Sequence, residues 1–425
     1  MTLGPDERLL ADCVHCGFCL PSCPTYVLWG EEMDSPRGRI HLMLGLHEGD
    51  VLTPAAVGHF DACLGCMGCL TSCPSGVQYD ALIEATRELI EVSAPHSRSE
   101  RLLRGTVFAL FPHPRRLRWA ARGLRLAQLL RLDRPLRNSA LLARRLPSVA
   151  AMLRLAPRLR RRRVIAPVTV TAPDALEVTL LTGCVQSVMF PEVNAATERV
   201  LAADGCRVSV PAGQGCCGAL SLHAGRKQEA LGYARRLIGQ IDALGGDGPV
   251  ITNAAGCGST LKEYGKLFAD DPDWRDPAAR FSARVQDVTE LLEQIGPHAE
   301  RHPIAAEVAY HDACHLAHAQ KVRSQPRAVL GQIPGLTIRE IAEGDLCCGS
   351  AGIYNIVNPG PAGELGDRKA DAVVATGAEL LIAGNPGCIM QIQNALQKRG
   401  ANLRAAHTIE LVDLSIRGGS VDELG

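Results

Sequence analysis

The decisive stretch reads Cys13-Val-His-Cys16-Gly-Phe-Cys19-Leu-Pro-Ser-Cys23-Pro24, and it recurs as Cys63-Leu-Gly-Cys66-Met-Gly-Cys69-Leu-Thr-Ser-Cys73-Pro74. Three thiolates two residues apart wrap one face of an iron–sulfur cubane. The fourth cysteine, three residues on, is turned away by the helix that we expect it to open, so it reaches the cluster of the other run. We therefore predict two 4Fe-4S clusters with crossed ligands: Cys13, Cys16, Cys19 and Cys73 for the first, and Cys63, Cys66, Cys69 and Cys23 for the second.

This spacing is that of bacterial two-cluster ferredoxins. Structural zinc sites use two separate Cys-x-x-Cys pairs, so the run of four followed by proline disfavours zinc here. The segment between the runs reads as helical, because Ser35 suits a helix N-cap and Pro36 the first helical turn. We expect an all-α ferredoxin-like domain over residues 1–97, analogous in fold to the iron–sulfur subunit of succinate dehydrogenase.

Composition places the whole chain among large folded proteins. It has 425 residues, 46% of them apolar, and 45 basic side chains balance 45 acidic ones. These values exclude a disordered chain and a polyanion binder of uniform charge. Seventeen cysteines in so long a chain favour metal or redox chemistry over a secreted disulfide scaffold. No apolar run has the roughly 18 residues of a spanning helix, and no signal peptide is recognisable, so we expect a cytoplasmic protein.

A basic segment joins the two cysteine-rich halves. From Arg98 to Arg163 there are 19 arginines, no lysine and two acids, a charge of +17 (19 minus 2). Its arginines at 118, 122 and 125 recur at helical spacing beside apolar positions 117, 121 and 124, which predicts an amphipathic helix in a linker over residues 98–173. Three roles compete: a solvated face, docking on a membrane surface or partner, and nucleic-acid binding. No recognition fold accompanies the arginines, which disfavours nucleic acid.

The second half is an internal repeat. Short apolar runs at 178–181, 250–252, 308–310 and 380–383 lead to cysteines and alternate with helical stretches, which predicts parallel sheets over residues 174–299 and 300–425. Ligands of parallel sheets gather at the carboxyl ends of strands, so the thiols of each repeat should converge. The offset between matched cysteines is 130 or 131 residues: Cys184, Cys216, Cys217 and Cys257 match Cys314, Cys347, Cys348 and Cys388.

These eight thiols allow several kinds of chemistry. They can hold an iron–sulfur centre or zinc, form redox-active pairs, or pack as small side chains at strand ends. Cys206 aligns with a leucine in the other repeat, so we expect it to be a buried apolar thiol. His311, His315 and His318 surround the second set alone. They are candidates for a proton donor or a ligand there, against the alternative of packing or capping histidines.

Both repeats resemble the CCG-type cysteine-rich domains of the heterodisulfide reductase B subunit family. The full pattern of that family ends in Cys-x-x-Cys, whereas Ala254 and Asn385 stand here in place of its first cysteine. Each repeat therefore keeps four thiols instead of five. This departure weakens the transfer of that family's double cluster.

Taken together, the motifs resemble the family of glycolate oxidase (glycolate dehydrogenase) iron–sulfur subunits. The resemblance covers nearly the whole chain and is carried by both cysteine runs, the stretch Ser35-Pro-Arg-Gly-Arg-Ile40, Ala254-Ala-Gly-Cys-Gly258, Lys262-Glu-Tyr-Gly265, His318-Ala-Gln-Lys321 and Cys347-Cys-Gly-Ser-Ala-Gly352. It implies a multidomain chain, an all-α ferredoxin-like domain followed by a duplicated α/β CCG domain. It also implies partner subunits that carry FAD and oxidise glycolate to glyoxylate.

The resemblance makes this chain the electron-transfer subunit of that complex, inactive alone, with a quinone or another membrane acceptor downstream. It would then lie on the inner face of the cell membrane. Subunits of lactate and glycerol-3-phosphate dehydrogenases share the layout and remain alternatives. Two further alternatives are a heterodisulfide-reductase-like thiol/disulfide oxidoreductase and a non-catalytic scaffold whose CCG repeats carry zinc.

Overall fold

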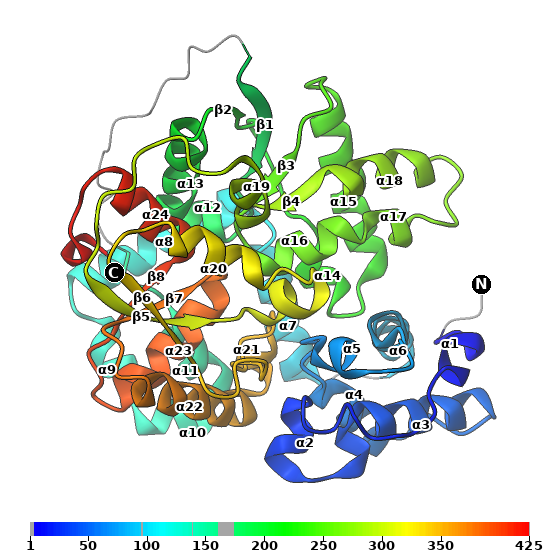
Figure 1. The fold of residues 1–425 in the computed structure, drawn as a ribbon. Coiled ribbons are helices and arrows are strands. Elements are labelled where there is room, and N and C mark those ends of the chain that lie inside the picture. Colours follow the sequence, from blue (N-terminus) through cyan, green and yellow to red (C-terminus); the bar gives the residue numbers. More distant parts are fainter. Residues whose placement is uncertain (1–3, 95–96, 138, 160–173, 425) are drawn as a thin grey trace.

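A computed structural model describes residues 4–94, 97–137, 139–159 and 174–424 of the chain (Figure 1). It has a helical N-terminal region followed by two sheets of identical topology, as the sequence predicts. The predicted domain limits at residues 97, 173 and 299 stay predictions.

The N-terminal region is helical throughout the part that carries the cysteine runs. Ser35 accepts a hydrogen bond from the backbone N–H of Gly38 at 3.0 Å and Pro36 begins the following helix, as expected for an N-cap and first turn. Phe60, Leu82 and Ile83 form its buried core. The elements are α1 (Glu7–Ala11), α2 (Pro24–Trp29), η1 (Glu32–Asp34), α3 (Pro36–His47), α4 (Pro54–Ala62), α5 (Gly68–Ser72) and α6 (Tyr79–Ser93).

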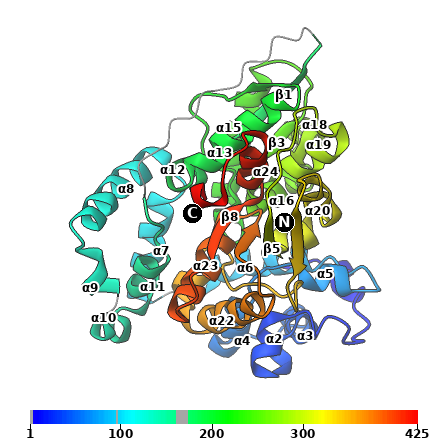
Figure 2. The ribbon, with the colours of Figure 1, turned by 60° about the vertical axis from the view of Figure 1, so that its left-hand side comes forward.

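Five helices make up the described part of the basic linker. They are α7 (Arg98–Leu110), α8 (Pro114–Leu129), α9 (Asp133–Arg137), α10 (Ala140–Arg145) and α11 (Pro147–Leu155). Helix α8 buries Leu117 and Ala121 and exposes Arg118 and Arg122, which confirms the predicted amphipathic helix. The arginines at 160–163 lie outside the described residues. Figure 2 shows these helices along one side of the molecule. Within the described ranges, no helix combines the length and apolarity needed to cross a membrane.

Each repeat contains a four-stranded parallel sheet. The first, in the order β2-β1-β3-β4, consists of β1 (Leu176–Leu181), β2 (Cys206–Ser209), β3 (Val250–Thr252) and β4 (Val285–Asp287). The second has the same order, β6-β5-β7-β8, with β5 (Ala306–His311), β6 (Leu336–Glu340), β7 (Leu380–Ala383) and β8 (Arg404–His407). Cys206 and Leu336 occupy the same register position, opposite Leu176 and Ala306. Cys206 is buried in the core, which confirms its predicted packing role.

Helices cover both sheets. Those of the first repeat are α12 (Gln186–Met189), α13 (Pro191–Ala203), α14 (Ala219–Leu222), α15 (Lys227–Asp242), α16 (Ala255–Lys262), α17 (Tyr264–Leu267), α18 (Arg275–Arg284) and α19 (Val288–Ile295). Those of the second are the π-helix η2 (His315–Ala319), α20 (Ser324–Gly331), α21 (Tyr354–Val357), α22 (Pro359–Ala375), α23 (Pro386–Lys398), α24 (Thr408–Ile416) and the 3-10 helix η3 (Val421–Glu423).

The two repeats share one core and form a pseudo-symmetric unit. Helix α13 packs against α24, and the equivalent pair α20 and α19 packs in the same way. Arg199 donates two hydrogen bonds of 2.8 Å to the carboxylate of Asp413 across the first of these contacts. Apolar side chains of both sheets, such as Val178 and Val308, belong to a single buried cluster. This arrangement presents the two sets of repeat thiols from equivalent sheet edges.

Candidate functional site: two cysteine clusters and two thiol sets

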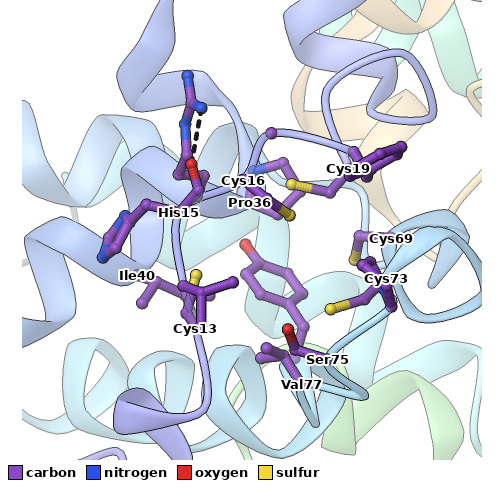
Figure 3. Close-up of a pocket in the computed structure, with 16 residues that line it drawn as sticks. Cys13, His15, Cys16, Cys19, Pro36, Ile40, Cys69, Cys73, Ser75 and Val77 are labelled. Carbon is purple, nitrogen blue, oxygen red and sulfur yellow. Dashed lines mark hydrogen bonds between the residues drawn. The ribbon is translucent and has the colours of Figure 1, made fainter.

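The first cysteine run lines a pocket at the N-terminal end of the molecule (Figure 3). All four cysteines of the predicted first set lie on it: Cys13, Cys16, Cys19 and Cys73. Cys69 of the predicted second set also reaches this pocket, between the two sets. Cys16 is exposed, and its neighbours Val14 and Phe18 are each 68% exposed. This end of the ferredoxin-like domain therefore faces the surface.

The second predicted set lies deeper in the molecule. Cys23, Cys63, Cys66 and Cys69 are all buried. Hydrogen-bond donors lie beside two of the sulfurs: the backbone N–H of Gly65 lies 3.4 Å from Cys63 Sγ, and the guanidinium of Arg39 lies 3.9 Å from Cys23 Sγ. Such donors favour thiolate ligands and tune the potential of an iron–sulfur cluster. The donor set therefore fits a 4Fe-4S cluster.

A local pseudo-two-fold relates the two runs. His15 and Gly17 have φ angles of 53° and 86°, and the matching Gly65 and Met67 have 64° and 63°. These left-handed positions turn each loop around its thiols. The hydroxyls of Ser22 and Ser72, each just before the fourth cysteine, lie 2.6 Å apart.

The expected helix at the fourth cysteine forms in the first run alone. Cys23 caps the N-terminus of α2, as predicted. Cys73 instead ends α5, and that part of the prediction is wrong. The chain turns at Gly76, which has a φ of 68°, so the next helix begins at Tyr79.

A buried arginine for which the sequence predicted no role lies beside the second set. Arg39 is fully buried, and its guanidinium donates to Thr25 Oγ1 at 3.1 Å and to the carbonyl of His59 at 2.6 Å, with Cys23 Sγ at 3.9 Å. Burial tends to raise the pKa of Cys63, but Arg39 and Arg87 outweigh it and the pKa is lowered. Arg39 lies next to Ile40 in α3, but its partners come from other segments, so the local sequence does not predict its role.

Without such compensation, burial raises the pKa of a thiol. The pKa of Cys19 is raised to about 11 by burial, and that of Cys69 is raised by burial and by the neighbouring thiols.

Arginines also hold the two cysteine loops. Arg87 donates from Nη2 to the carbonyl of Cys63 at 2.5 Å, and Arg37 donates from Nη1 to the carbonyl of His15 at 3.0 Å. An arginine therefore holds each loop, and Arg39, which is paired with Asp34 at 3.3 Å, lies beside the second set.

The four thiols of the first repeat converge at the carboxyl ends of its strands. Cys184 Sγ lies 3.5 Å from Cys216 Sγ. The side chain of Cys217 interacts with those of both Cys216 and Cys257. The glycine that follows the paired cysteines, Gly218, has a φ of 86°, and a Cβ there would lie 2.9 Å from the carbonyl of Ala230. The close approach explains why glycine follows the two cysteines.

The second repeat shows the same convergence. Cys314 Sγ lies 3.9 Å from Cys347 Sγ, and Cys348 interacts with both Cys347 and Cys388. Asn385, in the place of the missing cysteine, donates from Nδ2 to Cys388 Sγ at 3.3 Å. Both predicted sets of four thiols therefore come together.

The second repeat also contacts the ferredoxin-like domain. The thiols of Cys66 and Cys347 lie side by side in a buried cluster that includes Leu64 and Tyr354. The three predicted histidines lie at or near this junction, and the structure separates their roles.

His315 and His318 are hydrogen-bonded at the junction. His315 Nε2 lies 3.0 Å from the carbonyl of Gly65, and its Nδ1 lies 2.7 Å from Ser259 Oγ. His318 Nε2 lies 3.0 Å from the carbonyl of Asp345, and its Nδ1 lies 2.7 Å from Thr71 Oγ1. Because a carbonyl only accepts, each Nε2 donates. Both residues therefore join the ferredoxin-like domain to the repeats.

His311 differs from these two because neither of its ring nitrogens has a hydrogen-bond partner. Burial lowers the pKa of His311 to about 3 and that of His315 to about 3, and it also lowers the pKa of His318. All three rings are therefore neutral near pH 7. A role for any of them as proton donor stays a prediction.

Comparison with known proteins agrees with this arrangement. Residues 9–77 match the 4Fe-4S dicluster domain family, residues 178–262 and 308–393 match the cysteine-rich domain family, and residues 99–156 match the linker region of the glycolate oxidase iron–sulfur subunit. The chain is 38% identical to the probable glycolate oxidase iron–sulfur subunit of Bacillus subtilis (strain 168), covering 96% of this chain and 94% of the relative. The chain belongs to the glycolate oxidase iron–sulfur subunit family.

Other relatives carry related names. The glycolate oxidase iron–sulfur subunit of Escherichia coli (strain K12) is 34% identical over 96% of this chain and 95% of its own length. Lactate utilization protein A of Oceanobacillus iheyensis is 30% identical, covering 57% of this chain and 99% of its own length. As a member of the glycolate oxidase subunit family, the chain is an iron–sulfur component of an oxidoreductase complex.

The structure adds two half-buried carboxylates, Glu84 and Glu263, that sequence reasoning missed. Glu84 of α6 lies 3.2 Å from Nδ1 of His223, across the junction between the ferredoxin-like domain and the first repeat. Burial is the main cause that raises the pKa of Glu84 to about 7, and the negative charge of Asp80 is the second. Burial is likewise the main cause that raises the pKa of Glu263 to about 8, and the negative charge of Glu84 is the second. Nothing in the local sequence predicts this interaction, because the two residues meet only when the domains pack.

Proposed function

We propose that this chain is the electron-transfer subunit of a glycolate dehydrogenase complex. Its partners would be flavin-containing subunits that oxidise glycolate to glyoxylate, and its acceptor would be a quinone. The carrying observation is the succession of thiol sets, from the surface pocket through Cys69 and Cys66 to the second repeat. A 4Fe-4S cluster takes up and releases one electron at a time, which suits the stepwise oxidation of a reduced flavin.

The ligands we propose are the crossed sets. Cys13, Cys16, Cys19 and Cys73 would hold the first cluster, and Cys63, Cys66, Cys69 and Cys23 the second. Their positions support this, since Cys73 lines the pocket of the first run and Cys23 interacts with Cys66. The eight repeat thiols are further candidates for an iron–sulfur centre or zinc.

The surface around the first pocket is proposed to receive the flavin-containing subunit. Val14 and Phe18 are exposed apolar side chains on the loop that carries Cys16, which is itself exposed. Electron transfer falls off steeply with distance, so the partner should dock where the thiols approach the surface. Cys66 of the second set is instead buried against the second repeat.

We also propose that the linker helices bind the surface of an anionic membrane. Helix α8 and the residues after it expose Trp119, Leu126, Leu129 and Leu130 among arginines. Arg122 lies over the ring of Trp119 at 4.6 Å from its centroid. Exposed tryptophan and leucine with arginine are typical of interfacial helices. This face would bring the chain to a membrane-bound quinone.

Reconstitution tests the main proposal. The purified chain, with glycolate and a dye acceptor, should show no turnover until the flavin-containing subunits are added. Quinone reduction should then require both. Turnover by this chain alone would contradict the proposal. A complex that prefers lactate over glycolate would instead support the lactate alternative, which the relative from Oceanobacillus iheyensis favours.

A thiol/disulfide reductase is the second candidate function. The observation in its favour is the contact between paired thiols in each repeat, 3.5 Å for Cys184 and Cys216. The chemically reduced chain would then cleave a disulfide substrate stoichiometrically. If the reduced chain leaves disulfides intact while it reduces a quinone analogue, this candidate is excluded.

A further inference from the structure

A histidine and two thiols meet at the carboxyl end of β5. His311, Cys348 and Cys388 each offer one ligand atom, and these three atoms all lie within 4.8 Å of one another. The three side chains are at most 2% exposed. Neither ring nitrogen of His311 has a hydrogen-bond partner. A buried imidazole without a partner is costly, so its position beside two thiols calls for a ligand.

We propose that His311, Cys348 and Cys388 bind a single zinc ion. Nitrogen and sulfur donors are those that zinc prefers, in tetrahedral geometry. On binding, each thiol loses one proton as its sulfur–zinc bond forms, and the neutral imidazole contributes a nitrogen lone pair. The oxidation state of zinc does not change, so the site needs no oxidant or reductant. This inference narrows the proposed choice between an iron–sulfur centre and zinc in the repeats to zinc at this site, and it does not depend on the electron-transfer function.

Neighbouring residues suit such a site. Cys314 belongs to the same thiol set and interacts electrostatically with Cys388, so it is the donor we assign to the fourth position. Three thiolates around a divalent ion leave one negative charge. The ammonium group of Lys369, which is 2% exposed, faces Cys348 and Cys388 and offsets that charge. Its Nζ is held by the carbonyl of Glu343 at 2.6 Å.

The first repeat lacks the corresponding groups. Leu181 ends β1 where His311 ends β5, and Ile238 stands in α15 where Lys369 stands in α22. Cys217, the equivalent of Cys348, packs with Leu181 and Ile238 in an apolar cluster. The first repeat can therefore serve as a control for the second. We expect zinc in the second repeat and none in the equivalent place of the first.

Metal analysis of the full-length chain, purified without oxygen, tests the assignment. We expect one zinc per chain in addition to the iron of the two clusters. His311→Leu, which copies the residue of the first repeat, should weaken zinc binding at least about tenfold, because outer-shell changes alone cost that much. His311→Cys, which restores a donor, should retain zinc. Cobalt substituted for zinc should show thiolate-to-metal charge-transfer absorption that is lost in Cys348→Ala.

Cys217→Ala in the first repeat is the matched control and should leave the zinc content unchanged. The visible absorption of the 4Fe-4S clusters reports whether each variant is folded. Zinc that persists in both His311→Leu and Cys348→Ala would overturn the proposal. Wild-type chain without zinc would also overturn it, as would iron beyond that of two cubanes that disappears with Cys348.

Discussion

The thiol of Cys66, in the second ferredoxin run, lies beside the thiol of Cys347, in the second repeat. The two residues are far apart in sequence, yet both are buried in one apolar cluster. Cys66 is a proposed cluster ligand, whereas Cys347 is outside both ferredoxin runs. The second repeat therefore lies directly against the second predicted cluster site, called the inner cluster below, and can influence its reduction potential.

Cys347→Ala should lower the midpoint potential of the inner cluster. As a cluster ligand the sulfur of Cys66 can only accept a hydrogen bond, so the thiol of Cys347 would donate to it and stabilise the more negative, reduced state. A hydrogen bond worth about 1 kcal/mol corresponds to a shift on the order of 40 mV in a one-electron couple. Redox titration followed by EPR measures the shift. Cys216→Ala, at the equivalent place of the first repeat, should not change it. An unchanged potential in Cys347→Ala would show that the contact does not tune the cluster.

Because each run lends its fourth cysteine to the other cluster, substituting that cysteine should remove the cluster of the other run. Cys73→Ala should remove the cluster held by Cys13, Cys16 and Cys19, and Cys23→Ala should remove the cluster of the second run. Each variant should lose about half of the iron, and EPR of the remaining cluster identifies which one was lost. If Cys73→Ala instead spares the first cluster and destroys the second, the crossed assignment is wrong.

Cysteine spacing predicted which thiols lie near one another, because metal geometry restricts which spacings along the chain can serve, whereas the crossed ligation stays a prediction. The strands were predictable because their apolar runs are short and lead to those cysteines. Arg39 was not, since a buried arginine depends on partners from other segments, such as His59. The junction of Cys66 with Cys347 has no local pattern at all. Cys73 shows the limit within a motif, because one glycine turn delays the helix that its counterpart Cys23 opens.

Reversing charge on α8 should detach the chain from anionic vesicles. Arg118→Glu with Arg122→Glu replaces two exposed arginines, each worth about 1 kcal/mol near an anionic surface. Binding to vesicles that contain phosphatidylserine should weaken at least about tenfold in a sedimentation assay. Arg236→Glu with Arg280→Glu makes the same charge change on exposed positions of the first repeat and should have little effect. Equal loss in both double variants would mean that net charge, and not this helix, governs binding.

The half-buried carboxylates of Glu84 and Glu263 should make the chain less stable in alkaline solution. Both pKa values are raised above the ordinary 4.5, to about 7 and about 8, mainly by burial. The folded chain therefore binds more protons than the unfolded chain between about pH 4.5 and pH 8, and its stability falls as pH rises through that window. The loss should level off above about pH 9, where both carboxyl groups are ionised in the folded chain.

Glu263→Gln removes one of the two charges, so it should flatten this pH dependence. Because Glu84 then loses its charged neighbour, the variant should gain Tm relative to wild type at pH 9 and differ little at pH 6. Thermal unfolding followed by circular dichroism at both pH values measures the effect. Glu293→Gln, at an exposed position of α19, is the matched control and should keep the wild-type profile. If Glu263→Gln also keeps that profile, the two carboxyl groups titrate normally and do not make stability depend on pH.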